Sequence, residues 1–201
     1  MRGHRDEEQV DKDVLRSFVG PAFRSDGTRE SLRKQLEEVV IGTLRTYPNL
    51  SYFQGYHDII SVLLLTLSPS TPPDLAHQAA RRISLHFVRD SMTDDLNAIM
   101  GHLKILRRIV MSMDQDLALL SDRASPVPFF AISWILTLLS HDMDSFESTL
   151  RIFDFLISHG PSSILYLSAA IILSKERELK SLDDEEKWDP SMLHVILSRL
   201  P

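Results

Sequence analysis

The chain has 201 residues, enough for one globular domain with a substantial core or for part of a larger one. Hydrophobic residues make up 43% of it and charged residues 25%, which is ordinary for a globular protein. The net charge of −6 argues against a nucleic-acid backbone as the main partner. Because the sequence contains no cysteine, disulfides, thiolate metal sites and cysteine nucleophiles are excluded.

The first predicted helix spans residues 9–18. Three apolar residues share one of its faces at helical spacing: Val10, Val14 and Phe18. Asp13 and Arg16 project elsewhere, and their spacing brings the carboxylate and the guanidinium together on the helix surface. Taken alone, this pair is most simply a solvated ion pair.

The other helices are marked by the same apolar spacing, with proline-containing loops between several of them. The second begins at Thr28 or Ser31 and ends before Pro48. The rest are predicted, in chain order, over residues 58–67, 74–89, 96–120, 129–140, 145–158, 161–179 and 190–199. No segment shows the alternation of a strand, so the sequence predicts an all-α, multi-helix fold.

A stripe of apolar residues runs along the long predicted helix from Leu96 to Leu120. Such a stripe is compatible with a coiled-coil seam or with an ordinary core-facing surface. The other amphipathic helices of the chain favour the core-facing interpretation.

The segment Tyr52–Asp58 reads Tyr-Phe-Gln-Gly-Tyr-His-Asp and leads into a strongly apolar helix. An arginine and a glutamine are the two groups that GTP hydrolysis requires beyond a phosphate-binding loop and Mg²⁺. The chain has no Gly-x-x-x-x-Gly-Lys-Ser/Thr loop of its own. Arg16 and Gln54 together therefore indicate a protein that lends catalytic groups to a nucleotide held by another protein. Taken singly, Gln54 could bond backbone carbonyls, and Asp58 could be the N-cap of the helix that follows.

Other kinds of site find little support. The 8 histidines are scattered and form no His-Glu-x-x-His motif, so we expect no metal site. A Ser-His-Asp hydrolase has no Gly-x-Ser-x-Gly motif here to support it.

Four segments carry a resemblance when taken in order: Val10-x-x-Asp13-x-x-Arg16-Ser17, Tyr52-x-Gln54-Gly55, Trp134-Ile135-Leu136-Thr137-Leu138 and Arg151-x-x-Asp154-Phe155-Leu156. Together they resemble the TBC domain of Rab GTPase-activating proteins across almost the whole chain. Within that family, Tyr52–Asp58 and the region of Ser133 and Trp134 resemble most the branch anchored in the endoplasmic reticulum, which acts on the Rab of ER-to-Golgi traffic.

The resemblance implies a mechanism with two fingers. Arg16 would stabilise the charge that develops near the β–γ bridging oxygen of the partner's GTP. Gln54 would position the attacking water in place of the partner's own glutamine. Asp13 would orient Arg16, while Tyr52 and Gly55 would hold the loop of the glutamine finger.

Further residues are expected to support this arrangement. Asp58 is expected to support the glutamine finger from the helix that follows it. The resemblance implies that Trp134 anchors a helix and that Arg151 and Asp154 form a pair tying helices together. No cofactor is expected in the chain itself, because GTP and Mg²⁺ would be carried by the partner.

We expect residues 1–201 to form a single TBC-type domain without the family's N-terminal helices, since no Arg-x-x-x-Trp motif precedes Arg16. We likewise expect no C-terminal membrane anchor in it. The expected partner is a GTP-bound Rab, with no nucleic acid involved and with membrane contact only through segments absent from this chain. The expected location is the cytosolic face of the endoplasmic reticulum or of early secretory membranes.

Two alternatives remain at this point. The chain could be a catalytically silent TBC-like scaffold that binds GTPases or other trafficking proteins, although a scaffold needs neither Arg16 nor Gln54. It could also be a generic helical adaptor whose motif matches are accidental.

Overall fold

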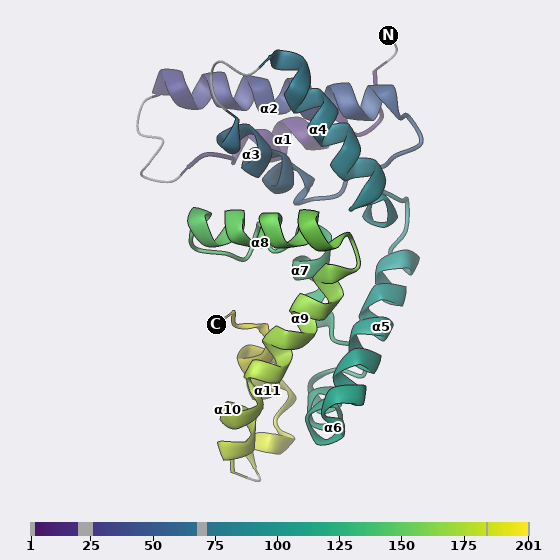
Figure 1. The fold of residues 1–201 in the computed structure, drawn as a ribbon, viewed down its shortest axis with the longest axis vertical. Coiled ribbons are helices and arrows are strands. Elements are labelled where there is room, and N and C mark those ends of the chain that lie inside the picture. The colour runs from purple at the N-terminus through teal and green to yellow at the C-terminus, as the bar shows by residue number, and fades with distance from the viewer. Residues whose placement is uncertain (1–2, 20–25, 68–71, 184, 201) are drawn as a thin grey trace. The chain divides into compact units, whose positions relative to one another are not determined.

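The computed structural model describes residues 3–19, 26–67, 72–183 and 185–200 (Figure 1). Within these ranges all regular secondary structure is helical and no strand is present, which confirms the predicted all-α fold. The chain divides into two compact units, Met1–Asp95 and Leu96–Pro201, called unit 1 and unit 2 below. No helix in the described ranges is both long and apolar enough to cross a membrane.

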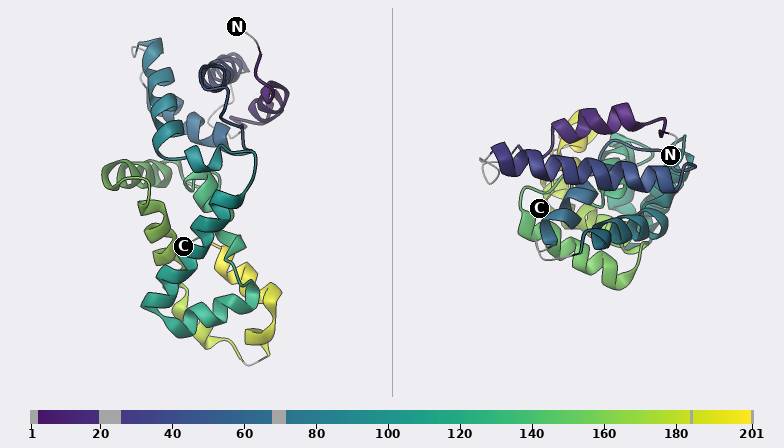
Figure 2. Two further views of the ribbon diagram at one scale, coloured as in Figure 1. Left: turned by 90° about the vertical axis from the view of Figure 1, so that its right-hand side faces the viewer. Right: turned by 90° about the horizontal axis from the view of Figure 1, so that it is seen from above.

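Unit 1 is built around its longest helix. Its elements are α1 (Glu7–Leu15), α2 (Asp26–Thr46), α3 (Tyr56–Thr66), α4 (Pro73–His86) and the short 3₁₀ helix η2 (Arg89–Ser91). Helix α2 packs against α1, α3 and α4, and Figure 2 shows α1 and α2 lying side by side. Contacts between Glu7 and Arg45 at one end, and between Ser17 and Arg33 at the other, make these two helices antiparallel.

The apolar spacing of the sequence explains this packing. The expected face of the first helix is buried, with Val10, Val14 and Phe18 at most 8% exposed. Helix α2 contributes a matching row of buried residues: Leu36, Val39, Val40 and Leu44. Gly42 lets α2 and α4 approach closely, because a Cβ there would come within 3.1 Å of the His77 ring.

Unit 2 contains the remaining helices. They are α5 (Asn97–Met113), α6 (Gln115–Ala124), η3 (Phe129–Ala131), α7 (Ile132–Thr137), α8 (Phe146–His159), α9 (Ser163–Ser174), α10 (Glu176–Ser181), η4 (Glu186–Trp188) and α11 (Pro190–Ser198). Helix α5 packs against α6, α7 and α9, while α11 packs against α6. The apolar stripe that begins in α5 is thus a core-facing surface, as favoured above.

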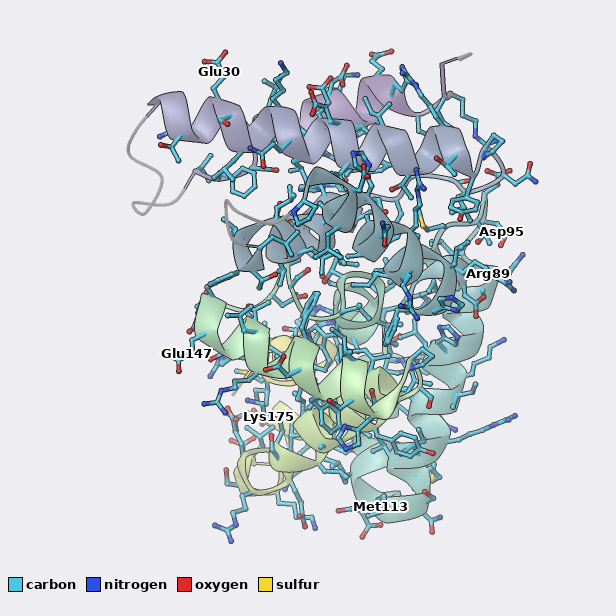
Figure 3. The ribbon with its side chains drawn as sticks, turned by 45° about the horizontal axis from the view of Figure 1, so that its top comes forward. Glu30, Arg89, Asp95, Met113, Glu147 and Lys175 are labelled. Atoms are coloured by element: carbon cyan, nitrogen blue, oxygen red, sulfur yellow. The ribbon has the colours of Figure 1, made fainter. Side chains whose placement is uncertain are left out.

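The prediction of one helix over 96–120 was wrong, because the chain turns at Asp114. This residue is extended, with φ −148° and ψ 102°, and its carboxylate accepts the Leu117 N–H at 2.9 Å as the N-cap of α6. Met113, labelled in Figure 3, is the last residue of α5. The stripe continued across the break because both helices bury their apolar sides in the same unit.

Smaller boundary errors have similar causes. The predicted helix over 161–179 is two helices that meet at Lys175, which ends α9 and precedes α10 (Figure 3). Thr28 and Ser31 lie inside α2 and cap nothing, because the helix already begins at Asp26. Asp58 is not an N-cap either, since α3 begins at Tyr56 and Gly55 holds the capping position.

Candidate functional site

Arg16 lies at the C-terminal end of α1, directly after its last helical residue. Its side chain is 66% exposed. The guanidinium Nη2 donates to Asp13 Oδ1, and Nε donates to the Lys12 carbonyl at 3.3 Å. Arg16 is therefore held along its own helix but remains open to an approaching partner.

Asp13 connects this helix to the loop of residues 51–55, which we call the glutamine loop. It is 1% exposed, so the expectation that it projects away from the core was wrong. Its Oδ1 also accepts from Gln9 Nε2 at 3.2 Å, and its Oδ2 accepts from the Tyr52 hydroxyl at 2.8 Å. Burial, followed by the hydrogen bond to Asp13, raises the pKa of Tyr52 far above its usual range. Tyr52 therefore remains a donor toward this carboxylate.

Gln54 is exposed at the tip of the glutamine loop, directly before α3. Gly55 is buried and has φ 105°, a left-handed conformation that favours glycine. Behind the tip, the Tyr56 N–H donates to the Phe53 carbonyl at 3.1 Å. The Tyr56 ring is fully buried with its hydroxyl 2.6 Å from Ser84 Oγ, and burial raises its pKa to about 12. The side-chain amide of Gln54 is thus exposed at the tip of a loop that is held in place by the buried residues after it.

The first residues of the glutamine loop are anchored to the rest of unit 1. The Ser51 N–H donates to the Met92 carbonyl at 2.9 Å, and the Ser51 hydroxyl donates to Asp94 Oδ1 at 2.5 Å. The Tyr52 N–H donates to Asp6 Oδ2 at 2.8 Å. These three contacts come from segments distant in sequence, so they fix the path of the loop before it reaches Gln54.

The chain after Arg16 is held by α2, a feature that the sequence analysis missed. Arg33 donates through Nε and Nη2 to the Ser17 carbonyl, at 3.1 and 2.9 Å. Phe18 then takes a left-handed conformation with φ 57°, which is unfavourable for a residue with a side chain. Arg33 is therefore placed to hold the end of the helix that carries Arg16.

The sequence pattern also assigned no role to His57, because the scattered histidines form no recognisable motif. Its Nδ1 lies 2.9 Å from the Tyr52 hydroxyl oxygen and 3.9 Å from Asp13 Oδ2. Its Nε2 lies 3.3 Å from Asp58 Oδ1. Asp58, expected to support the loop, thus faces this histidine from the first turn of α3. The position of His57 inside the motif was the signal that could have drawn attention to it.

All the predicted site residues lie in unit 1. Arg16 and Tyr52 both donate hydrogen bonds to Asp13, so the three side chains form one network. Gln54 and Gly55 follow Tyr52 in the same loop.

The three residues of unit 2 that were expected to support the fold, Trp134, Arg151 and Asp154, differ in their burial and contacts. Trp134 is 1% exposed and lies edge-on to the Phe130 ring, as an anchoring residue should. Arg151 and Asp154 are both exposed on the same helix, α8, and no ion pair joins their side chains within the described part of the chain. The expectation that this pair ties helices together was wrong.

The site lies on the surface, since Arg16 and Gln54 are both exposed. A groove of about 720 Å³ in unit 1 is lined by α2 and α4 and includes none of the predicted site residues. Among the described residues, no group of histidine and acidic side chains is arranged to hold a metal ion. The site is an exposed arginine and an exposed glutamine held on a buried polar network, an arrangement suited to insertion into a partner.

Comparison with known proteins identifies the family. Residues 2–180 match the family model described as the Rab-GTPase-TBC domain. The chain belongs to this family. The match spans most of both units and excludes the interpretation of an adaptor with accidental motifs.

Individual relatives agree with the TBC assignment. The chain is 30% identical over 198 residues to TBC1 domain family member 20 of Bos taurus and of Homo sapiens, covering 98% of this chain and 47% of each relative. It is 30% identical over 201 residues to GTPase-activating protein gyp10 of Schizosaccharomyces pombe, covering 98% of this chain and 52% of that protein. The TBC domain described here thus spans about half the length of these relatives.

A solved structure supports the fold. The crystal structure of the Ypt/Rab-GAP domain of Gyp1p matches with a TM-score of 0.64 and 19% identity, covering 98% of this chain and 73% of that chain. At this identity the similarity establishes the fold alone.

Proposed function

We propose that this TBC domain is a GTPase-activating domain for a Rab-type small GTPase. Arg16 and Gln54 enter the partner's nucleotide site, where GTP and Mg²⁺ are already bound. The domain hydrolyses no nucleotide alone. The names of the relatives, two of them TBC1 domain proteins and one a GTPase-activating protein, support this proposal.

The observation that carries the proposal is the link between the two exposed groups. Arg16 and the glutamine loop are joined through the buried carboxylate of Asp13, which accepts from both Arg16 and Tyr52. A scaffold that only binds GTPases has no use for a buried polar network behind an exposed arginine and glutamine. The silent scaffold is therefore the second candidate, favoured only if no GTPase is stimulated.

The first prediction concerns Arg16. An arginine supplied in trans accelerates GTP hydrolysis by roughly 10³–10⁵, which corresponds to about 4–7 kcal/mol of transition-state stabilisation. Arg16→Ala should remove most of the stimulation measured by phosphate release from GTP-loaded Rabs. Arg16→Lys should recover little, because lysine lacks the planar set of donors. Near-normal turnover by either variant, with an unchanged melting temperature, would contradict the role of Arg16.

The second prediction concerns Gln54. If Gln54 positions the attacking water, a Rab whose own catalytic glutamine has been changed to leucine should still be stimulated. Gln54→Ala should then be impaired toward both the normal and the leucine-bearing Rab. Stimulation of the normal Rab alone would assign the chemistry to the partner's glutamine and leave Arg16 as the sole finger.

The same assay identifies the partner. The resemblance of Tyr52–Asp58 to the branch anchored in the endoplasmic reticulum makes the Rab of ER-to-Golgi traffic the first candidate of a GTP-loaded panel. We propose that the activity takes place at the cytosolic face of the endoplasmic reticulum or of early secretory membranes, the location that this resemblance supports.

A further inference from the structure

His57 occupies the centre of the polar network behind the two fingers. Its side chain is 12% exposed, and it is the second residue of α3, three residues after Gln54. Acidic or phenolic groups face its ring from three elements: Asp13 on α1, Tyr52 in the glutamine loop and Asp58 on α3. One imidazole thus contacts residues on both sides of Gln54 and on the helix of Arg16.

The hydrogen-bond donors and acceptors around the His57 imidazole indicate which of its nitrogens carry hydrogens. The Tyr52 hydroxyl has one hydrogen, and the ionised carboxylate of Asp13 can only accept it, over 2.8 Å. The Tyr52 oxygen is then available to accept from His57 Nδ1, which lies 2.9 Å away. This arrangement favours a hydrogen on Nδ1.

The surroundings of the second ring nitrogen, Nε2, also favour a hydrogen on it. His57 Nε2 faces Asp58 Oδ1 at 3.3 Å. A neutral ring with its hydrogen on Nδ1 would set a lone pair against the carboxylate oxygen, whereas a hydrogen on Nε2 makes the contact attractive. An imidazole with hydrogens on both nitrogens is a cation.

A cation at this position matters because Arg16 has to move. Within the described residues, Arg16 and His57 are the two basic side chains within 4.0 Å of the Asp13 carboxylate. When Arg16 turns toward a nucleotide, the carboxylate stays buried, and a buried charge left without a counter-charge is strongly unfavourable. His57 remains beside it, 3.9 Å from Oδ2.

We propose that His57 is a positioning residue for both fingers: as an imidazolium it holds the Tyr52 hydroxyl on Asp13 and stays as the counter-charge of that carboxylate when Arg16 is released. The part that concerns Arg16 rests on the proposed function. The hydrogen bond through Nδ1 holds the glutamine loop, and the positive charge lowers the cost of releasing the arginine. His57 touches neither substrate nor nucleotide in this role.

Two substitutions separate the hydrogen bond from the charge. In His57→Asn the amide nitrogen stands near the position of Nδ1, so it can donate to Tyr52 without a charge. His57→Leu retains bulk but loses both functions. We expect His57→Leu to lower the maximal rate of stimulated GTP hydrolysis by about 10- to 100-fold, as misplaced catalytic groups do. His57→Asn should restore part of that loss.

Further measurements distinguish positioning from a loss of folding. The KM for the GTP-loaded Rab should change by less than about threefold in both variants, since the loss concerns placement of groups in the transition state. In an Asp13→Asn background, replacing His57 by asparagine should have little further effect, because no carboxylate remains to be neutralised. His86→Asn, an exposed histidine on α4, is the matched control and should retain full activity.

The last measurement needs no GTPase. Nitrogen-15 NMR of the intact chain at neutral pH should show His57 protonated on both ring nitrogens, with Nδ1 coupled to a hydrogen bond. A neutral ring, or unchanged turnover in His57→Leu, would overturn the proposal. If the wild-type domain stimulates no GTPase, the proposed function fails, while the NMR result still decides the state of His57.

Discussion

At the scale of single residues, Asp13 does the most to organise the site. One oxygen accepts from Arg16 and Gln9 on its own helix, and the other accepts from Tyr52, which lies 39 positions further along the chain. A carboxylate can take such contacts on several sides because its two oxygens offer about four lone-pair directions. Both proposed fingers are therefore positioned by the same buried carboxylate, that of Asp13.

Arg33 gives a prediction at this scale. Arg33→Met keeps the aliphatic part of the side chain but removes both donors to the Ser17 carbonyl. Because the strained turn at Phe18 then loses its support, the end of α1 should become mobile and Arg16 less well placed. We expect stimulated GTP hydrolysis to fall by about tenfold or more.

The control for Arg33 is its exposed neighbour. Lys34→Met removes a cation from α2 that does not contact Ser17, so its rate should match the wild type. If Arg33→Met also kept the wild-type rate while its melting temperature fell, Arg33 would stabilise the fold without placing Arg16.

At the scale of elements, α1 and α2 are joined at both ends by arginines of α2. At the end opposite Arg33, Arg45 meets Glu7 through two contacts of 2.7 Å each. The hydrogen bond from Arg45, followed by one from the His4 backbone, lowers the pKa of Glu7 from 4.5 to about 2. This pair fixes the start of α1 as Arg33 fixes its end.

The Glu7 carboxylate predicts a dependence of stability on pH. Since its pKa is lower in the folded chain, it contributes stability above pH 4.5 and loses that contribution as the pH falls toward about 2. The pair is partly open to solvent, so Glu7→Gln should lower the free energy of unfolding at pH 7 by about 1 kcal/mol at most. Urea titrations should show this difference shrinking between pH 4.5 and about 2.

The control for Glu7 is Glu8→Gln, which removes a pair made with Lys12 on the same helix and joins no two elements. It should change stability less than Glu7→Gln. A difference for Glu7→Gln that persisted undiminished at the lowest pH would show that the contribution of Glu7 is not electrostatic.

At the scale of the whole chain, the two units differ in which predicted residues they contain. Unit 1 holds every predicted site residue and the contacts that position them, while the described part of unit 2 contains the buried Trp134. The family match covers both units, so unit 2 belongs to the TBC domain without supplying a proposed finger.

The two tryptophans, one buried and one exposed, test whether Trp134 stabilises unit 2. Trp134→Ala empties a buried position and should cost about 3–5 kcal/mol of unfolding free energy. Trp188 is 68% exposed and stacks on Arg123, so Trp188→Ala should cost about 1 kcal/mol or less. Circular dichroism in urea is the appropriate probe, because both substitutions alter fluorescence. Equal midpoints for the two variants would show that Trp134 does not anchor unit 2.

Much of this protein followed from the sequence by itself. The all-α fold and the buried face of α1 depend on the spacing of apolar residues, which is a local property of the chain. The proximity of Asp13 and Arg16 follows from the geometry of one helix. The glycine after Gln54 is itself visible in the sequence, whereas its φ of 105° was established by the structure.

Only the tertiary structure decided how these pieces combine. The contacts of Tyr52 with Asp13, of Arg33 with Ser17 and of Arg45 with Glu7 join residues 16 to 39 positions apart. They depend on how α1 packs against α2 and the glutamine loop, which no local pattern specifies. The break at Asp114 was missed for a related reason: an apolar stripe reports which side is buried, whereas the break depends on a single capping carboxylate and on what each helix packs against.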